Sequence, residues 1–406
     1  MSAAGEAEVA PPRSGVLVTF RESPRAVKAL LFGVLVNKLG AFLQVFLVLF
    51  MTSRGIDDVR AGFALGAYGA GSVLGVLVGG TFSDRIGPRR TIVLGMLATA
   101  PLLVAVLYVR VYPALLASVV VVSVLSQVYR PAAAALLAEY TPEHRQVMVF
   151  AMYRLALNLG TTAAPLLGVA LAAVSYDLLF WGEALASLGY AAIAAFVLPR
   201  SADAVGRSRD ATQRGTGRGG YLAVLADRRF AAYLVAMLVN AAVYTQYLST
   251  LPLAMRDAGL ATLWYGVVVA INGAMVICFE LLMTRVVQNW PARLVLAIGF
   301  TLLGGGFACY ALPGGLAVFV IGTLLWSLAE IIEGPTMFAY PAKAGPERLR
   351  GRYLGAAHAM FGVGSALGPM IGVPLWAQLG PAAWVVFGAA SVIALAPAWY
   401  GVGRAR

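Results

Sequence analysis

Charged residues are scarce in this chain. They make up 12% of its 406 residues, while hydrophobic residues make up 60%. Soluble domains carry roughly 25% charged and 45–50% apolar residues, so this composition excludes a water-soluble enzyme and a disordered chain. The two cysteines, Cys278 and Cys309, lie in apolar runs and lack the spacing of a disulfide framework or a metal site. The sequence has no G-x-x-x-x-G-K-[ST] loop, which argues against direct ATP drive.

Long apolar runs make up most of the remaining sequence. A bilayer core about 30 Å thick needs about 20 apolar residues in a helix. Runs such as 115–125 do not alternate between polar and apolar residues, so the sequence predicts helices and not the strands of a barrel. An all-α integral membrane protein with twelve spans is therefore expected. The approximate limits of the spans are 28–52, 61–82, 91–110, 113–138, 147–173, 178–198, 229–253, 262–284, 293–312, 314–340, 353–377 and 382–402.

The distribution of positive charge predicts the orientation of these spans. An even number of spans puts both ends of the chain on one side. That side receives 23 of the 30 Lys and Arg residues, against 4 on the other. We therefore expect both termini in the cytoplasm, with residues 1–27 as a cytoplasmic tail. The same distribution accounts for the net charge of +12 without a nucleic-acid partner.

A polar stretch rich in Arg, Gly and Ser, residues 200–228, follows the sixth span. Its composition is typical of a flexible linker. The linker would divide the chain into an N-terminal six-helix bundle, residues 28–199, and a C-terminal bundle, residues 229–406.

The two halves are related in sequence at an offset of 204 residues, and the strongest stretch pairs GTTAAPLLGVAL with GSALGPMIGVPL. Among the matched pairs are Gly160 with Gly364, Pro165 with Pro369, and Gly168 with Gly372. Six spans per repeat give both halves the same orientation, about an axis along the membrane normal. This architecture is typical of a rocking-bundle transporter with a substrate cavity between the halves. A duplication retained for packing alone is the alternative.

The segment after the second span, residues 80–90, reads GTFSDRIGPRR. It matches G-x-x-x-D-[RK]-x-G-x-[RK]-[RK] at every defined position. The matching residues are Gly80, Asp84, Arg85, Gly87, Arg89 and Arg90. This pattern resembles the loop signature of the major facilitator superfamily, and the span count and the central basic loop extend the resemblance over essentially the whole chain. The resemblance implies two pseudo-symmetric six-helix bundles.

The same resemblance implies a gating role for this loop. In the superfamily the loop locks the outward-facing state at the cytoplasmic side, which assigns that role here to Asp84, Arg85 and Arg89. Because a glycine lets a neighbouring helix approach closely, Gly80 is expected to face such a helix. The alternative, which we favour for Arg90, is that the arginines only enforce topology.

The fifth span carries GTTAAPLLG, residues 160–168, which is similar to the antiporter signature G-x-x-x-G-P-x-x-G-G of that superfamily. Ala164 and Val169 replace two of its glycines, and a better copy lies in the eleventh span. Small residues and a proline predict close packing and a hinge. The hinge candidates are Gly160, Pro165, Gly168, Gly364, Gly368, Pro369 and Gly372. The signature favours export over import.

Ionisable residues inside the spans are functional candidates, because a buried charge costs about 3 kcal/mol or more unless it is paired or hydrated. They are Lys38, Arg130, Arg154, Glu183, Glu280, Glu330 and Glu333. By depth, Lys38 is near the midplane, Arg130 and Glu330 are in the cytoplasmic half, and Glu183 is near the outer surface. Glu330 and Glu333 share one helix face.

These charges suggest how transport is driven. A desolvated carboxylate at Glu330 is able to take up and release a proton, so we hypothesise that Glu330, and after it Glu280, couples transport to the proton gradient. The alternative is a static ion pair of Glu330 with Arg130 or Lys38. His358 occupies the repeat position of Arg154, where it is either a proton relay or a packing histidine.

These observations predict a secondary transporter, not an enzyme, that works by alternating access in the cell membrane. Proton-coupled export of a drug-like or amphipathic small molecule is the expected activity. A proton-coupled symporter that imports a small metabolite or peptide, and a non-transporting receptor on the same fold, are the alternatives. The expected partners are the substrate, protons and the lipid bilayer. We expect a monomer with no cofactor, metal or nucleic acid.

Overall fold

The structure is a computed structural model that describes residues 16–199, 224–287, 289–344, 346 and 350–402. In this part of the chain every regular element is a helix. The helices of the first half are α1 (Val16–Glu22), α2 (Arg25–Leu39), α3 (Leu43–Ser53), α4 (Asp58–Ile86), α5 (Pro88–Val106), α6 (Tyr112–Gln127), α7 (Tyr129–Glu139), α8 (Glu143–Ala172) and α9 (Asp177–Val197). Those of the second half are α12 (Arg228–Tyr244), α13 (Gln246–Asp257), α14 (Thr262–Val287), α15 (Ala292–Cys309), α16 (Leu316–Ala339), α17 (Pro341–Ala344), α18 (Arg350–Leu379) and α19 (Ala382–Gly401).

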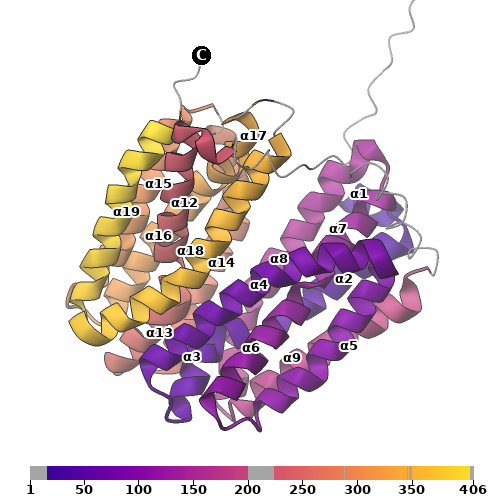
Figure 1. The fold of residues 1–406 in the computed structure, drawn as a ribbon, viewed down its shortest axis with the longest axis horizontal. Coiled ribbons are helices and arrows are strands. Elements are labelled where there is room, and N and C mark those ends of the chain that lie inside the picture. Colours follow the sequence, from indigo (N-terminus) through magenta and orange to yellow (C-terminus); the bar gives the residue numbers. More distant parts are fainter. Residues whose placement is uncertain (1–15, 200–223, 288, 345, 347–349, 403–406) are drawn as a thin grey trace, which may run out of the picture.

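Twelve segments of the described chain are long and apolar enough to cross a membrane. Each overlaps one of the expected spans. For example, the second runs from Asp58 to Ser83, and the last from Ala382 to Gly401. The all-α, twelve-span prediction is therefore confirmed. The helices before residue 200 form one group and those after residue 223 form another (Figure 1).

Three spans are each built from two helices. The first changes direction between α2 and α3, the fourth at Val128 between α6 and α7, and the seventh at Thr245 between α12 and α13. Pro131 accounts for the break in the fourth span. It has no N–H to bond the carbonyl four residues earlier, that of Gln127, and α6 ends at that residue. The sequence analysis did not predict these breaks.

The hydrophobic core is shared by the two groups at one side of the molecule and divided at the other. We call the side that carries α1 and α17, where α9 ends and α12 begins, the terminal face, and the opposite side the far face. One buried cluster joins residues of both groups, including Phe46, Leu251 and Trp384. A second cluster, around Tyr190, belongs to the first group alone, and a third, around Tyr233, belongs to the second group alone. The groups thus converge toward the far face and separate toward the terminal face (Figure 1).

The most extensive contacts between the two groups run along two pairs of long helices, α4 with α18 and α8 with α14, while α13 also meets α3. Glycines make this approach possible. The Cβ position of Gly66 in α4 lies 2.5 Å from the carbonyl oxygen of Ala366 in α18, and that of Gly266 in α14 lies 2.5 Å from the side chain of Val169 in α8. A surface of small residues lets two helix backbones meet without interlocking side chains. Such an interface is suited to sliding or rocking.

The expected linker, residues 200–228, lies mostly outside the described residues. Its last part is anchored to the second group. Val224 is fully buried there, and the Asp227 carboxylate accepts hydrogen bonds from the N–H groups of Arg229 and Phe230, both at 3.1 Å. Asp227 also accepts from the Tyr353 hydroxyl at 3.0 Å. An N-terminal aspartate cap of this kind fixes where α12 begins.

The interface glycines give a stability prediction. Gly66→Leu places a side chain where Ala366 and Met370 already lie, so we expect it to lower the free energy of unfolding by ~1–3 kcal/mol through overpacking. Gly305→Leu is the matched control, because no atom lies within 4 Å of the Cβ position at Gly305. Thermal melting of the purified variants in detergent measures the difference. Equal melting temperatures for both variants would contradict the tight interface.

Candidate functional site

A polar cavity lies between the two groups of helices. Its volume is about 170 Å³. The first group contributes α8, through Asn158, Thr161 and Thr162, and the second contributes α12, α13, α14 and α16. The residues from the second group are Tyr244, Tyr247, Val269, Asn272, Gly273, Val276 and Glu330. Amide, hydroxyl, phenol and carboxylate groups from both halves therefore meet at one place.

Glu330 is held in this cavity by an amide and not by a cation. The Asn272 side chain in α14 donates a hydrogen bond to the Glu330 carboxylate at 2.9 Å, and also donates to the Ser327 hydroxyl at 3.1 Å. Ser327 lies one turn before Glu330 in α16, so Asn272 fixes that face of α16 against α14. An amide N–H is able to donate to a carboxyl group whether or not that group carries a proton.

Glu333 lies one turn further along α16 and is almost fully buried, with 4% of its surface exposed. The Asn240 side chain in α12 donates to its Oε1 atom at 2.9 Å. Its Oε2 atom has no hydrogen-bond partner among the described residues. Glu330 and Glu333 both line a second cavity of about 100 Å³, so the predicted common face is confirmed.

Aromatic rings form the wall beside Glu330. Tyr244 and Tyr247 stand edge-on to each other at 5.1 Å between ring centroids, and Tyr247 stacks on Trp326 at 5.4 Å. The Trp326 indole N–H donates to the Tyr310 hydroxyl at 2.8 Å, which holds the indole in place. Rigid aromatic faces next to a few hydrogen-bonding groups are typical of sites for small amphipathic molecules.

Glu280 does not line either of these cavities. It forms an ion pair with Arg154 of α8, with 2.5 Å between Glu280 Oε1 and Arg154 Nη2. The pair joins α14 to α8 and therefore bridges the two groups of helices. Arg154 is the more exposed partner, at 66% of its side chain, against 18% for Glu280.

The alternative of a static pair between Glu330 and a cation is wrong for this structure. Within the described part of the chain, no ion pair joins Glu330 to Arg130 or to Lys38. Arg130 is exposed on α7, and Lys38 is half-buried at the end of α2. Both cations belong to the first group, whereas the carboxylate belongs to the second. The depth of each residue in the membrane, which was estimated from the sequence, could not show that these charged groups do not meet.

His358 is exposed on α18. Its Nδ1 atom is 2.8 Å from the carbonyl oxygen of Leu354, one turn earlier in the same helix. Its ring lies 5.4 Å from that of Phe338, which lines the 100 Å³ cavity. Its hydrogen bond stays within its own helix, so its role as a relay or as a packing residue stays a prediction.

The motif of residues 80–90, expected as a loop, covers the end of α4, Gly87 and the start of α5. Gly87 has a φ of 93°, a conformation suited to glycine, and it joins α4 directly to α5. Arg89 donates to the carbonyl oxygens of Ala195 at 2.7 Å and Leu198 at 3.1 Å, at the end of α9. Arg293, its counterpart in the repeat, donates in the same way to Val402 after α19 at 2.6 Å. Both arginines thus satisfy carbonyls at a helix end.

Of the other motif residues, Gly80 and Arg85 lie in the last turns of α4, and Arg90 lies in the first turn of α5. No atom lies within 4 Å of the Cβ position at Gly80, so the expected close approach of a neighbouring helix is not made in this conformation. Arg85 and Arg90 are exposed, and the side chain of Asp84 lies outside the described residues. Their part in gating stays a prediction.

The hinge candidates pack inside each half. Gly160 and Gly168 in α8 face Lys38 and Phe46 of the first span, while Gly364 and Gly372 in α18 face Leu238 and Gln246 of the seventh. Gly368 faces Ala242 of the same span. The repeat therefore preserves a close contact between equivalent helices. Pro165 and Pro369 lie inside α8 and α18, which both continue through them.

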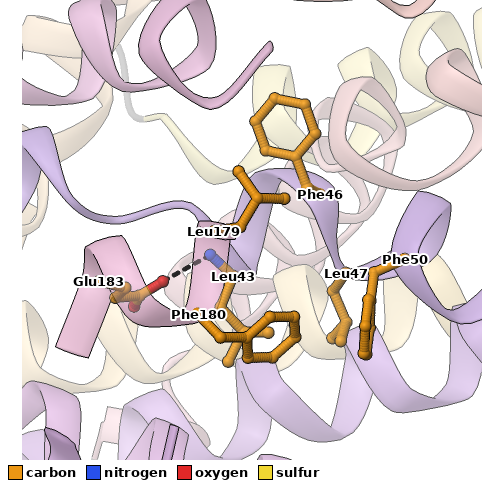
Figure 2. Close-up of a pocket in the computed structure, with 7 residues that line it drawn as sticks. All are labelled: Leu43, Phe46, Leu47, Phe50, Leu179, Phe180 and Glu183. Carbon is orange, nitrogen blue, oxygen red and sulfur yellow. Dashed lines mark hydrogen bonds between the residues drawn. The ribbon is translucent and has the colours of Figure 1, made fainter. Parts of the chain in front are cut away.

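Glu183 makes a contact that the sequence analysis did not predict. It lies near the start of α9 and is buried inside the protein, with 6% of its surface exposed. Its expected depth, near the outer side of the membrane, stays a prediction. Figure 2 shows its carboxylate pointing to the backbone N–H of Leu43, which donates a hydrogen bond to it at 2.6 Å. Leu43 is the first residue of α3, so Glu183 satisfies the new helix start that the break in the first span creates. Only the break, which was not predicted, would have indicated this position.

At the far face a second set of charges joins the two groups. Arg256 at the end of α13 makes two hydrogen bonds with Asp58 at the start of α4, at 2.9 and 3.1 Å. Asp257 holds the same guanidinium at 2.8 Å and accepts from the Trp376 indole N–H at 3.1 Å. A depression of about 820 Å³ opens beside these residues. The bidentate pair ties the halves together on the side where their core is shared.

Comparison with known proteins shows which family has this architecture. A family model described as Major Facilitator Superfamily matches residues 30–369. The MFS-type transporter YttB of Bacillus subtilis (strain 168) is 26% identical over 86% of this chain and 88% of its own length. The chloramphenicol resistance protein of Streptomyces lividans is 28% identical over 80% and 84%. The Na(+), Li(+), K(+)/H(+) antiporter of Planococcus maritimus is 24% identical over 76% and 79%.

Solved structures show the same fold. The nucleoside transporter NupG superposes with a TM-score of 0.77 over 92% of this chain and 98% of its own, at 14% sequence identity. A POT family transporter in complex with a thioalcohol-conjugated peptide gives a TM-score of 0.74 over 93% and 96%, at 13% identity. With twelve apolar helices in the described chain, a polar cavity between two helix groups and a family match over most of its length, this chain belongs to the major facilitator superfamily and is a secondary transporter, not an enzyme.

Proposed function

We propose that this transporter exports a drug-like or amphipathic small molecule in exchange for protons. The observation that carries the proposal is the carboxylate pair of α16. Glu330 lines the cavity between the two halves, and Glu333 is buried one turn further along the helix, inside the second half. Both carboxylates are held by amides, and neither forms an ion pair with a described cation. A group that carries protons has to change its charge during the cycle, and amide partners allow both charge states.

The surroundings of Glu330 support an amphipathic substrate. The cavity beside it combines the phenols of Tyr244 and Tyr247 with the amide of Asn158 and with apolar side chains. A drug resistance protein and an ion/proton antiporter are among the relatives, which favours export and exchange over import. The multidrug resistance protein MdtH of Edwardsiella ictaluri, 25% identical over 72% of this chain, points the same way.

We further propose that transport proceeds by alternating access across the cell membrane, with the terminal face in the cytoplasm and the protein working as a monomer. The charge asymmetry of the sequence supports this orientation. The structure then corresponds to an inward-open state, because the cores of the two halves are separate toward the terminal face. In the opposite state the shared contacts at the far face have to open, including the Arg256–Asp58 pair.

Glu330→Gln tests the coupling step. Because glutamine cannot carry the proton, we expect gradient-driven accumulation in proteoliposomes to fall by at least about tenfold, while substrate binding stays within about twofold. Radiolabelled chloramphenicol and the fluorescent amphiphile 1-pyrenebutyrate serve as probes, and an uncoupler gives the baseline. Glu139→Gln, at an exposed position at the end of α7, is the matched control and should transport normally.

Two results would count against the proposal. Full gradient-driven transport by Glu330→Gln would remove Glu330 as the proton carrier. Binding of the probes by the wild type without any accumulation would favour a receptor on this fold. The direction of accumulation relative to the pH gradient distinguishes export from import.

Asp58→Asn tests the far-face contact. Losing one carboxylate from the bidentate pair should favour opening at that face by up to ~1 kcal/mol, which corresponds to a rise of about two- to fivefold in the open population. The measurement is the rate at which a membrane-impermeant maleimide labels Val373→Cys, in a background with Cys278 and Cys309 replaced by serine. Val373 is fully buried where α18 meets Gly62 of α4.

Asp57→Asn is the control for this experiment. Asp57 pairs with Arg60, three residues away in the same half, so its loss should leave the labelling rate unchanged. Equal labelling of the Asp58 and Asp57 variants would show that the Arg256–Asp58 pair does not hold the far face closed.

A further inference from the structure

Two cavities of the structure meet at Glu330. The cavity between the halves and the second cavity, of about 100 Å³, have two lining residues in common, Glu330 and Tyr244. The first contains residues of both halves, whereas every residue that lines the second belongs to the second half. A molecule in the first cavity therefore reaches Glu330 from one side, and the second cavity gives a separate approach to the same carboxylate.

The second cavity is suited to hold water. The carboxylates of Glu330 and Glu333, the Asn240 amide and the Tyr244 phenol line it, together with apolar side chains. Its volume has room for several water molecules, and a buried water needs about two to four polar partners. Water in this cavity is able to join the two carboxylates, which lie one turn apart on α16.

Glu333 has one carboxylate oxygen without a partner. Its Oε1 atom accepts from Asn240, while its Oε2 atom makes no hydrogen bond with a described residue. Oε2 faces Gly299 of α15, where a Cβ atom would collide with it, so the glycine leaves room for this oxygen. Because an unpartnered buried oxygen is unfavourable, a proton or a water molecule is needed at Glu333.

Along α16 the second cavity leads from Glu330 toward the terminal face. The residues of α16 that line it are Glu330, Glu333, Gly334, Met337 and Phe338, and the helix ends beside α17, which lies on that face. Phe338 is exposed, and its ring lies 5.4 Å from that of His358 on α18, which is also exposed. The cavity therefore extends from the buried carboxylates toward an exposed end.

The helices around Glu333 offer it no fixed cation. The ionisable side chains that face Glu333 or its cavity are Glu330 on its own helix, Tyr233 and Tyr244 on α12, and His358 on α18. Helix α15 carries no ionisable residue between Arg293 and Cys309, and Glu280 of α14 is paired with Arg154. In the described part of the chain, neither Glu330 nor Glu333 forms an ion pair. Two carboxylates one turn apart without an ion pair favour a state in which one of them carries a proton.

We propose that Glu333 receives the proton that Glu330 releases, through water in the second cavity, and passes it toward the terminal face. In this step the O–H bond of the Glu330 carboxyl group breaks and its proton moves to a water molecule, while a proton of that water forms an O–H bond at Glu333. The total charge of the pair is unchanged. The proton is thus able to leave while the substrate stays in the cavity between the halves. The inference rests on the proposed proton exchange and gives the proton its route.

A pH jump on the full-length protein in nanodiscs tests this route in the reverse direction. Light releases protons from a caged compound, and time-resolved infrared spectroscopy follows the C=O bands of the protonated carboxyl groups. Glu330→Gln and Glu333→Gln identify the two bands. We expect Glu333→Gln to slow the protonation of Glu330 by at least about tenfold.

The choice of substitution separates a proton-carrying role of Glu333 from a structural one. Glutamine keeps the size of the side chain and an oxygen that accepts from Asn240, so a purely structural role would leave the rate unchanged. Glu333→Asp keeps the ionisable group and should retain most of the rate.

Gly334→Leu tests the cavity without changing a carboxylate. Gly334 lines the cavity, and no atom lies within 4 Å of its Cβ position, so leucine takes up space there without a clash. We expect the same slowing, of at least about tenfold, with an unchanged Glu330 band at equilibrium. Gly305→Leu, at an exposed position of α15 that lines neither cavity, is the matched control and should behave as wild type. Melting temperatures show whether each variant is folded.

Two results would overturn the proposal. Wild-type rates in both Glu333→Gln and Gly334→Leu would show that the proton reaches Glu330 by another path. Loss of the Glu333 band in sodium chloride but not in choline chloride would show that the cavity binds a metal cation. Because the measurement uses neither substrate nor gradient, it is independent of transport. Slowed protonation without accumulation of either probe would retain the route and reject the export function, whereas accumulation that needs Glu330, with wild-type rates in both variants, would do the reverse.

Discussion

The structure depends on one constraint, namely that a charge within the apolar interior has to be compensated where it lies. The chain has few charges there and compensates them in different ways. A backbone N–H at a helix start compensates Glu183, and an arginine of the other half compensates Glu280. Amides hold Glu330 and Glu333. An arginine partner favours one charge state of a carboxyl group, whereas an amide accommodates both. A carboxylate that is paired with an arginine therefore keeps its charge, whereas a carboxylate that is held by an amide is able to gain or lose a proton.

The same constraint shapes the contact between the halves. If the interface were a thick hydrophobic core along its whole length, the halves could not separate. Instead, a common core exists toward the far face, and the long helices meet through glycines such as Gly66 and Gly266. The charged contacts across the interface, Arg256–Asp58 and Arg154–Glu280, include partly exposed side chains. Pairs of that kind contribute little stability each, so they bias a conformational equilibrium without fixing it.

The sequence predicted the elements better than their contacts. Span limits follow from hydrophobic length, and the repeat from matched glycines, because both signals are local. The pairing of charges depends on how each helix is rotated and on where a span breaks. Neither property can be read from a short stretch of sequence. The break in the first span between Leu39 and Leu43 creates a helix start whose first N–H group donates to Glu183, a contact that the depth of Glu183 in its span does not reveal. In the same way, Arg89 matched a gating motif, yet its observed partners are carbonyls at the end of α9.

Comparison of the repeat positions shows how the two halves divide their roles. At the offset of 204 residues, the packing glycines coincide, but the charges do not. Ser126 and Tyr129 stand where the second half has Glu330 and Glu333, and Ala242 and Gly334 stand where the first half has Lys38 and Arg130. The shared residues set how each bundle packs, which both halves need equally. The differing residues give the first half two cations and the second half two carboxylates at these positions. The two halves are therefore equivalent in how they pack but not in the charges that they carry, so they cannot take interchangeable parts in a cycle that moves charge.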